Sequence, residues 1–136
     1  GWGSELTTEI TPMEAGLDRF VDFSKCFLGR EATLSRKLLG VNTKLVYVSV
    51  ETADSDCLGN ETVLNTEAPS GENIIGVTTS GAYGHTVSQS LAFAYVQPKF
   101  AEPGTKFEIR VLGHNCSATV LKEAAYDPHN LRLRDV

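Results

Sequence analysis

The sequence predicts a mainly β domain, an antiparallel barrel or sandwich that follows a short helical segment. Three observations predict this class. From residue 44 onward, short runs rich in β-branched residues alternate between apolar and polar positions. Turn-forming clusters such as Glu102–Thr105 separate these runs at the spacing typical of all-β domains. The strongest helix signals lie within the first 40 residues, and a length of 136 residues is that of one domain.

Two helices and a strand are expected before residue 41. A short helix is predicted to start at TPME (residues 11–14), where Thr caps, Pro takes the first helical position and Glu lies in the first turn. Gly16 ends it soon afterwards, and Phe20–Phe23 then predicts a strand. The best helix candidate is GREATLSRKLL (residues 29–39), which Gly40 ends at the usual C-terminal position.

The remaining chain is expected to form strands. The first, KLVYVSVET, alternates with period two and is rich in β-branched residues. The expected strands are Lys44–Thr52, Thr62–Leu64, Ile74–Ser80, Leu91–Val96, Phe107–Leu112 and Ser117–Leu121.

The segment rich in Gly, Ser and Thr at Gly76–Thr86 looks at first like a catalytic or phosphate-binding loop. It lacks GxxxxGK[ST], GxGxxG and GxSxG, and Ser80 has no visible base partner. We therefore expect its glycines to let a strand bend inside a small barrel, with Tyr83 and His85 at the corner.

Charge and cysteine usage narrow the classes of partner and compartment. The net charge is −5 with no basic tract, which argues against nucleic acid as a partner. No apolar run approaches the ~18 residues of a membrane span, and no signal-peptide pattern opens the chain. The odd number of widely spaced cysteines (Cys26, Cys57 and Cys116) favours free thiols in a reducing compartment, so the sequons at Asn60 and Asn115 are not expected to carry glycans. The chain lacks an initial Met and opens in mid-pattern, so we expect a piece of a longer protein.

No residue is predicted to be catalytic or to bind a metal. The three histidines, at positions 85, 114 and 129, have no metal-ligand spacing, and the cysteines do not complete a ligand set. The acidic cluster of Glu5, Glu9 and Glu14 lies near a predicted helix start, where a role in balancing the helix dipole is expected. The residues by themselves therefore indicate a β-rich domain without a self-contained catalytic apparatus.

Four stretches, in order and at the expected separations across nearly the whole chain, resemble a known family. They are WGSELTTEITPMEAGLDRFV (Trp2–Val21), FLGREA (Phe27–Ala32), TTSGAYGHTVSQSLAFAYV (Thr78–Val96) and YDPHNLRLR (Tyr126–Arg134). The chain resembles the C-terminal part of the folate-dependent aminomethyltransferase superfamily, and within it the dimethylglycine and sarcosine dehydrogenase branch.

The resemblance implies a fold and a place in a larger protein. Residues 1–40 are expected to end a folate-binding region (short helix, strand, helix), and residues 41–136 to form a six-stranded Greek-key or jelly-roll-like barrel that packs against the upstream folate-binding domain. In this branch an N-terminal FAD domain oxidises a small methylated amine such as dimethylglycine or sarcosine, and tetrahydrofolate accepts the one-carbon unit. The family's FAD domain and its folate-assisting Asp both lie upstream of the matched stretches, so the isolated chain is expected to bind no flavin and to be inactive.

The resemblance also implies cofactor-binding residues. In the family an aromatic residue after the EAGL motif packs beside folate, and Arg19 stands at that position here. Its guanidinium suits stacking on a pterin or pairing with the folate glutamate tail; the alternative is an exposed salt bridge with Asp18 or Asp22. A C-terminal Arg also approaches folate in the family, for which Arg132 and Arg134 are both candidates.

Two other functions stay open. The chain could belong to a non-enzymatic regulatory relative that kept the fold, or to a tetrahydrofolate aminomethyltransferase without a flavin domain. The resemblance implies a bacterial cytoplasmic or mitochondrial matrix protein, without a nucleic-acid or membrane partner.

Overall fold

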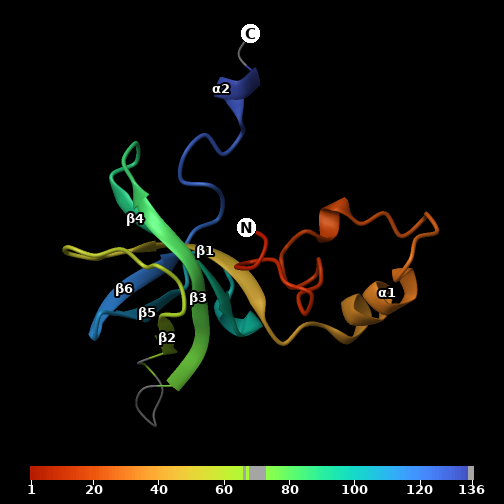
Figure 1. Ribbon diagram of the computed structural model, residues 1–136, viewed down its shortest axis with the longest axis horizontal. Coiled ribbons are helices and arrows are strands. Elements are labelled where there is room, and N and C mark those ends of the chain that lie inside the picture. The colour runs from red at the N-terminus through yellow and green to blue at the C-terminus, as the bar shows by residue number, and fades with distance from the viewer. Residues whose placement is uncertain (66, 68–72, 135–136) are drawn as a thin grey trace.

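Six antiparallel strands close into a barrel in the computed structural model, which describes residues 1–65, 67 and 73–134 (Figure 1). The strands are β1 (Lys44–Val50), β2 (Thr62–Asn65), β3 (Asn73–Gly84), β4 (Gln89–Val96), β5 (Lys106–Val111) and β6 (His114–Val120). Their order around the barrel is β1-β4-β3-β2-β5-β6, and β6 pairs back onto β1. Because β5 lies beside β2, the strands β5-β2-β3-β4 form a Greek key. The prediction of a mainly β, six-stranded barrel is confirmed.

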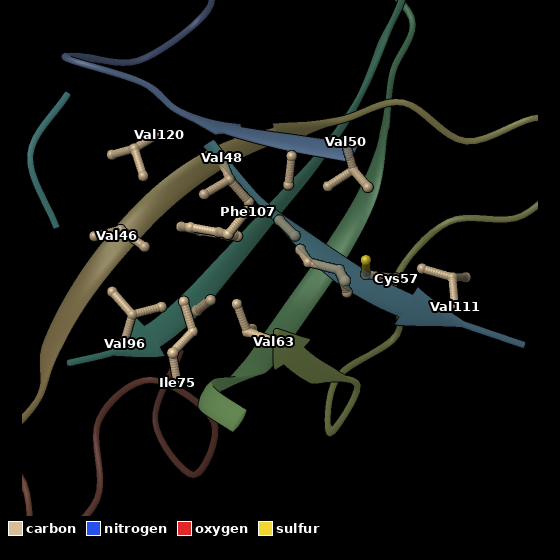
Figure 2. Close-up of a cluster of buried hydrophobic side chains, with 14 residues drawn as sticks. Val46, Val48, Val50, Cys57, Val63, Ile75, Val96, Phe107, Val111 and Val120 are labelled. Atoms are coloured by element: carbon tan, nitrogen blue, oxygen red, sulfur yellow. The ribbon is translucent and has the colours of Figure 1, made fainter. Parts of the chain in front are cut away.

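The interior of the barrel is filled by one side of each strand. Burial along β1 alternates, so that Val46, Val48 and Val50 point inward. Figure 2 shows these valines converging with Phe107 of β5 and with Cys57, which comes from the loop between β1 and β2. Burying each valine or phenylalanine contributes about 1.5–3 kcal/mol. This dry interior leaves the outer face of the sheet, rather than the centre of the barrel, as the surface on which a ligand can bind.

The Gly-rich segment lies in β3, which is longer than predicted and ends at Gly84. A Cβ on Gly76 would lie 2.1 Å from the carbonyl oxygen of Tyr95, and one on Gly81 would lie 2.5 Å from that of Cys57. At these two positions glycine is needed so that two backbones can approach each other. The register of β3 against β4 also shifts between Thr78 and Ser80, which marks a β-bulge.

Strand β5 ends one residue earlier than predicted, where the hairpin to β6 begins. Val111 pairs with His114, so only Leu112 and Gly113 form the turn. Both have positive φ, 47° and 85°, as a type I′ turn requires. The strand predicted to reach Leu112 therefore ends at Val111, because turn geometry outweighs the β-propensity of leucine.

The segment before the barrel contains one α-helix among the described residues, α1 (Arg30–Leu39), which lies within the helix predicted for residues 29–39. The prediction of a helix starting at Thr11 is wrong: the chain forms only a single turn there. The Leu17 N–H donates to the carbonyl of Pro12 at 2.8 Å and Gly16 has φ 67°, a Schellman arrangement that closes the turn at once. In Figure 1 α1 lies away from the barrel, and the red N-terminal part of the chain lies between them.

The strand predicted at Phe20–Phe23 is also wrong. A 3-10 helix, η1 (Asp18–Phe20), occupies its start, and residues 21–23 pair with no strand among the residues that the structure describes. Phe20 is 69% exposed, so its side chain does not belong to a sheet face that packs on a core. A run of apolar residues becomes a strand only where another backbone can satisfy its N–H and C=O groups.

Two further short helices are η2 (Pro98–Phe100), after β4, and α2 (Leu131–Arg134), in the C-terminal tail. No helix in the described part of the chain is long and apolar enough to cross a membrane.

Candidate cofactor-binding groove

A groove of about 670 Å³ lies on the outer face of the barrel, between η1 and strands β1, β4 and β6. Its lining includes Arg19 from η1, Lys44 and Tyr47 from β1, Phe93 from β4 and Lys122, which follows β6. These residues come from four separate stretches of sequence, and the closure of β6 onto β1 brings them together. The groove is open to solvent.

An aromatic pair forms the apolar part of this groove. Tyr47 and Phe93 face each other in register across β1 and β4, with ring centroids 4.9 Å apart and an interplanar angle of 31°. Both occupy outward positions, since their neighbours Val46, Val48, Ala92 and Ala94 fill the interior. Phe93 nevertheless remains 38% exposed. Partial burial raises the pKa of Tyr47.

Positive side chains line the same groove as the aromatic pair, although the whole chain carries a charge of −5. Arg19, Lys44 and Lys122 line the groove, against one acidic side chain, Glu123. A flat ring placed against aromatic side chains, and carboxylates placed near ammonium or guanidinium groups, are the contacts that this set of residues can make. A planar heterocycle with an acidic tail fits this set.

The structure places the predicted site residues in two different regions. Arg19 lines the groove and its guanidinium lies 4.7 Å from the centroid of the Phe20 ring. Asp22, one of the two carboxylates considered as its salt-bridge partner, instead pairs with Lys25 at 3.5 Å. Arg19 is therefore oriented by an aromatic ring and lies at the surface of the groove.

Arg132 and Arg134 lie on α2, at the end of the C-terminal tail. The carboxylate of Asp127 caps this helix by accepting from the N–H groups of Leu131 and Arg132 at 2.7 and 3.0 Å. The Arg132 guanidinium lies 6.0 Å from the centroid of the Tyr126 ring. In Figure 1 α2 projects away from the barrel and from the orange-red segment that holds η1, so the structure does not bring these two arginines to Arg19.

A second hollow, of about 290 Å³, lies on the other side of the aromatic pair. Tyr47 and Phe93 line it as they line the groove, together with Ser80, Ala82 and Leu91. We use the term aromatic ridge for Tyr47 and Phe93, which stand between the hollow and the groove.

The N-terminal segment is held against the barrel beside this ridge. The Glu5 carboxylate accepts from the hydroxyls of Thr79 and Ser80 at 2.7 and 2.6 Å, and the Tyr95 hydroxyl donates to the Glu5 carbonyl at 2.7 Å. Adjacent residues of a regular strand point to opposite faces, so the bulge in β3 is what turns both hydroxyls toward one carboxylate. Burial opposes the charge, but the amino group that Gly1 carries as the first residue of this 136-residue chain and these two hydroxyls outweigh it and lower the pKa of Glu5 to about 2.

A second buried carboxylate, Glu14, ties the segment to β1 and α1. The Leu45 N–H donates to its carbonyl at 2.8 Å, and its carboxylate lies 3.6 Å from the Arg36 guanidinium. The carboxylate also accepts from the N–H and hydroxyl of Thr11, which completes the cap of the single turn. Glu5 and Glu14 are thus anchors of the segment, not the solvated helix-dipole residues that the sequence predicted.

The cysteines are free thiols, as predicted. Cys57 is fully buried, and burial, with smaller contributions from Glu61, Cys116 and Asp56, raises its pKa to about 12. A thiol with so high a pKa is a poor nucleophile. Glu61 beside it accepts from the N–H groups of Leu58 and Gly59, at 2.8 and 3.0 Å, and from Thr78, so this cluster closes the end of the barrel rather than forming a reactive site.

Sequence reasoning selected Arg19 but missed Tyr47, Phe93, Lys44 and Lys122. A signal for the first two was present. KLVYVSV and SLAFAYV place an aromatic residue at the outward phase of strands whose inward phase is already apolar. An outward aromatic on a fully packed barrel is a surface feature in need of an explanation.

Comparison with known proteins agrees with this architecture. The chain is 40% identical over 137 aligned residues to "Dimethylglycine dehydrogenase, mitochondrial" of Rattus norvegicus, which covers 98% of this chain and 15% of the relative. It is 33% identical to "Aminomethyltransferase" of Aquifex aeolicus, over 89% of this chain and 32% of the relative. The solved structure of glycine cleavage system aminomethyltransferase T from Bartonella henselae superposes with a TM-score of 0.83 at 23% identity, covering 94% of this chain and 35% of that one.

The chain therefore spans only a small part of the relatives it matches. A family described as "Glycine cleavage T-protein C-terminal barrel domain" matches residues 44–127, which hold all six strands. The chain belongs to the glycine cleavage T-protein C-terminal barrel family, and it resembles the dimethylglycine dehydrogenases within the wider group of aminomethyltransferase relatives.

Proposed function

We propose that this chain is the C-terminal, folate-side domain of an FAD- and tetrahydrofolate-dependent N-methyl amine dehydrogenase. The single observation that carries the folate part is the groove that Arg19, Lys44 and Lys122 line together with the Tyr47–Phe93 pair. The similarity to dimethylglycine dehydrogenases over 98% of the chain supports the choice of enzyme class. The division into residues 1–40, the end of the folate-binding region, and 41–136, the barrel domain, is part of this proposal.

The residues of the groove match the chemistry of a folate. The pterin ring is planar and aromatic and stacks on Tyr47, Phe93 or the Arg19 guanidinium. The glutamate tail is anionic and pairs with Lys44 or Lys122. Tetrahydrofolate, when bound, accepts the one-carbon unit. The residues of this chain bind and orient it, and none of them is assigned a catalytic role.

The oxidation takes place elsewhere in the intact protein. An upstream FAD domain removes hydride from a small methylated amine, dimethylglycine or sarcosine, and the protein works in the mitochondrial matrix or the bacterial cytoplasm. The isolated chain is inactive, binds no flavin and holds tetrahydrofolate weakly, because an open groove on one domain supplies only one wall of a binding site. Micromolar affinity of the isolated chain for tetrahydrofolate, measured by calorimetry, would contradict this part of the proposal.

An experiment on the intact protein tests the role of the groove. Arg19→Ala and Lys122→Ala should each weaken tetrahydrofolate binding about 5-fold or more, the loss of one ionic hydrogen bond (~1 kcal/mol). Amine oxidation measured with an artificial electron acceptor should be unchanged. The matched control is Lys106→Ala, an exposed lysine on β5 that does not line the groove. Equal loss of folate binding and amine oxidation would mean that these residues are structural, and no loss of either would remove the groove from the site.

The same assay distinguishes which of the two C-terminal arginines, Arg132 or Arg134, contacts folate. Arg132→Ala or Arg134→Ala should weaken tetrahydrofolate binding only if the tail folds back over the groove in the intact protein. A change confined to one of them would identify the residue that faces folate.

A tetrahydrofolate aminomethyltransferase without a flavin domain is the second candidate. The similarity to the Aquifex aeolicus aminomethyltransferase, over 89% of the chain, favours it. Flavin absorbance of the purified intact protein decides between the two, since only the dehydrogenase carries FAD.

A further inference from the structure

Glu14 is a buried acidic residue whose contacts reach three separate parts of the chain. It is 4% exposed and does not line the groove. Its carboxylate accepts from the Thr11 N–H at 3.1 Å and lies 3.6 Å from the Arg36 guanidinium of α1, and its carbonyl accepts from the Leu45 N–H of β1 at 2.8 Å. Burying a charge costs free energy unless partners compensate it, so this carboxylate is tied to the groups around it.

We infer that Glu14 is a positioning residue for the folate-binding groove. Through its bonds to α1 and β1 it fixes the Arg19 guanidinium relative to the Lys44 ammonium group, so that both cations meet one ligand. The inference rests on the proposed function, because it takes the groove to be the folate site. It goes further by making the affinity for tetrahydrofolate depend on a residue outside the groove.

The path along the chain from Glu14 to Arg19 is short and closed by hydrogen bonds. The Leu17 N–H donates to the Pro12 carbonyl at 2.8 Å and closes the single turn that contains Glu14. The Phe20 N–H then donates to the Leu17 carbonyl at 3.0 Å and closes η1, which carries Arg19. The two turns follow each other directly, so a shift of Glu14 moves Arg19 with it.

The part of the groove that β1 supplies is tied to the same residue. Leu45, whose N–H bonds to the Glu14 carbonyl, lines the groove, and Lys44 directly precedes it. Ala15, the neighbour of Glu14 in sequence, also lines the groove and is buried. Two cations bind one anionic ligand more tightly when their spacing is set beforehand, because ordering them on binding costs free energy.

Arg36 offers a second way to disturb Glu14. Its side chain is 45% exposed on α1 and does not line the groove. Arg36→Gln removes the ion pair and leaves the bonds of Glu14 to Thr11 and Leu45 in place. An effect of this substitution on tetrahydrofolate binding therefore passes through Glu14.

A double-mutant cycle in the intact polypeptide tests the inference. The dissociation constant of tetrahydrofolate and the rate of amine oxidation with an artificial electron acceptor are measured for the parent, Glu14→Gln, Arg19→Ala and the double variant. We expect Glu14→Gln to weaken tetrahydrofolate binding about 5-fold at an unchanged oxidation rate. In the Arg19→Ala background it should weaken binding by less than about 2-fold, because the cation that Glu14 positions is then absent.

Two further variants complete the design. Arg36→Gln should weaken tetrahydrofolate binding about 2-fold, and this loss should also disappear in the Arg19→Ala background. Glu5→Gln is the matched control, because Glu5 is a second buried carboxylate of the same segment and its partners Thr79 and Ser80 do not line the groove. It should change tetrahydrofolate binding by less than about 2-fold. Circular dichroism establishes that each variant is folded at the assay temperature.

The other outcomes overturn the inference in distinguishable ways. Additive losses in the cycle, or an equal loss for Glu5→Gln, would make Glu14 a structural anchor only. No loss for Glu14→Gln, while Arg19→Ala weakens binding, would overturn the inference and retain the proposed function. No loss for Arg19→Ala would reject the groove as the folate site, and the inference with it. If Glu14→Gln does not fold, the cycle of Arg36→Gln with Arg19→Ala decides among the same outcomes.

Discussion

Gly76→Ala tests whether the barrel depends on close contact between β3 and β4. Gly76 pairs with Val96, next to the position where the register between β2 and β3 shifts. A Cβ there would lie 2.1 Å from the Tyr95 carbonyl oxygen and 2.9 Å from the Val96 Cα. Both are backbone atoms of a strand that is hydrogen-bonded on its other side to β1, so they cannot move aside alone.

The expected cost follows from this geometry. Ordinary contact requires more than 3 Å, so β3 and β4 must separate locally by about 1 Å from their usual ~4.8 Å spacing. Overpacking of this kind costs about 1–3 kcal/mol, and weakening two ladder hydrogen bonds adds about 1–2 kcal/mol. The reduced freedom of the unfolded alanine chain returns about 0.4–1 kcal/mol. The net expectation is a loss of ~3 kcal/mol in the free energy of unfolding.

Urea unfolding followed by circular dichroism measures this loss, with the slope m checked for constancy. The matched control is Gly84→Ala in the same strand, where a Cβ would lie 2.9 and 3.0 Å from side-chain atoms of Leu91 and Val87, and the nearest backbone atom, the Gln89 carbonyl oxygen, is 3.4 Å away. Those side chains can rotate, so the control should change stability by less than about 1 kcal/mol. If Gly76→Ala proved as stable as Gly84→Ala, the close-approach argument would be refuted.

Three further predictions concern the anchor, the core and the thiols. Glu5→Gln should lower stability by about 2 kcal/mol at neutral pH. The folded pKa of Glu5 is about 2, below its ordinary value of 4.5. The difference in the free energy of unfolding between the parent and Glu5→Gln should therefore shrink as the pH falls from about 5 toward 2. A difference that stays constant with pH in urea titrations would argue against ionic anchoring. Ile109→Ala, at a fully buried position, should cost about 2–5 kcal/mol in the same assay, and a cost below 1 kcal/mol would mean that the barrel interior collapses freely. In the native chain a thiol reagent should label exposed Cys26 rapidly, whereas Cys57 should react only on unfolding; fast labelling of Cys57 would show that the loop closing the barrel opens readily.

Much of the fold could be predicted because local signals and tertiary structure agree. The alternation of KLVYVSV predicted β1, and in the structure the same alternation separates its buried valines from its outward residues, since side chains of a strand alternate between faces. Gly40 ended α1 where expected. The failures lie where the tertiary environment decides. Phe20–Phe23 has the composition of a strand but no neighbouring backbone to pair with, and the turn at Thr11 is closed by the left-handed Gly16 before a helix can propagate.

The sequence by itself determined where the six barrel strands lie and the resemblance to a family, because these depend on periodicity and on motifs that are read along the chain. It also pointed to Arg19. Only the tertiary structure decided that Arg19 and Lys122, about a hundred positions apart in sequence, line one groove, since this depends on the pairing of β6 with β1. The bulge in β3 likewise decided that the hydroxyls of Thr79 and Ser80 both donate to the Glu5 carboxylate. Such convergence arises from strand order and register, which are set by contacts between distant parts of the chain and leave no pattern among neighbouring residues.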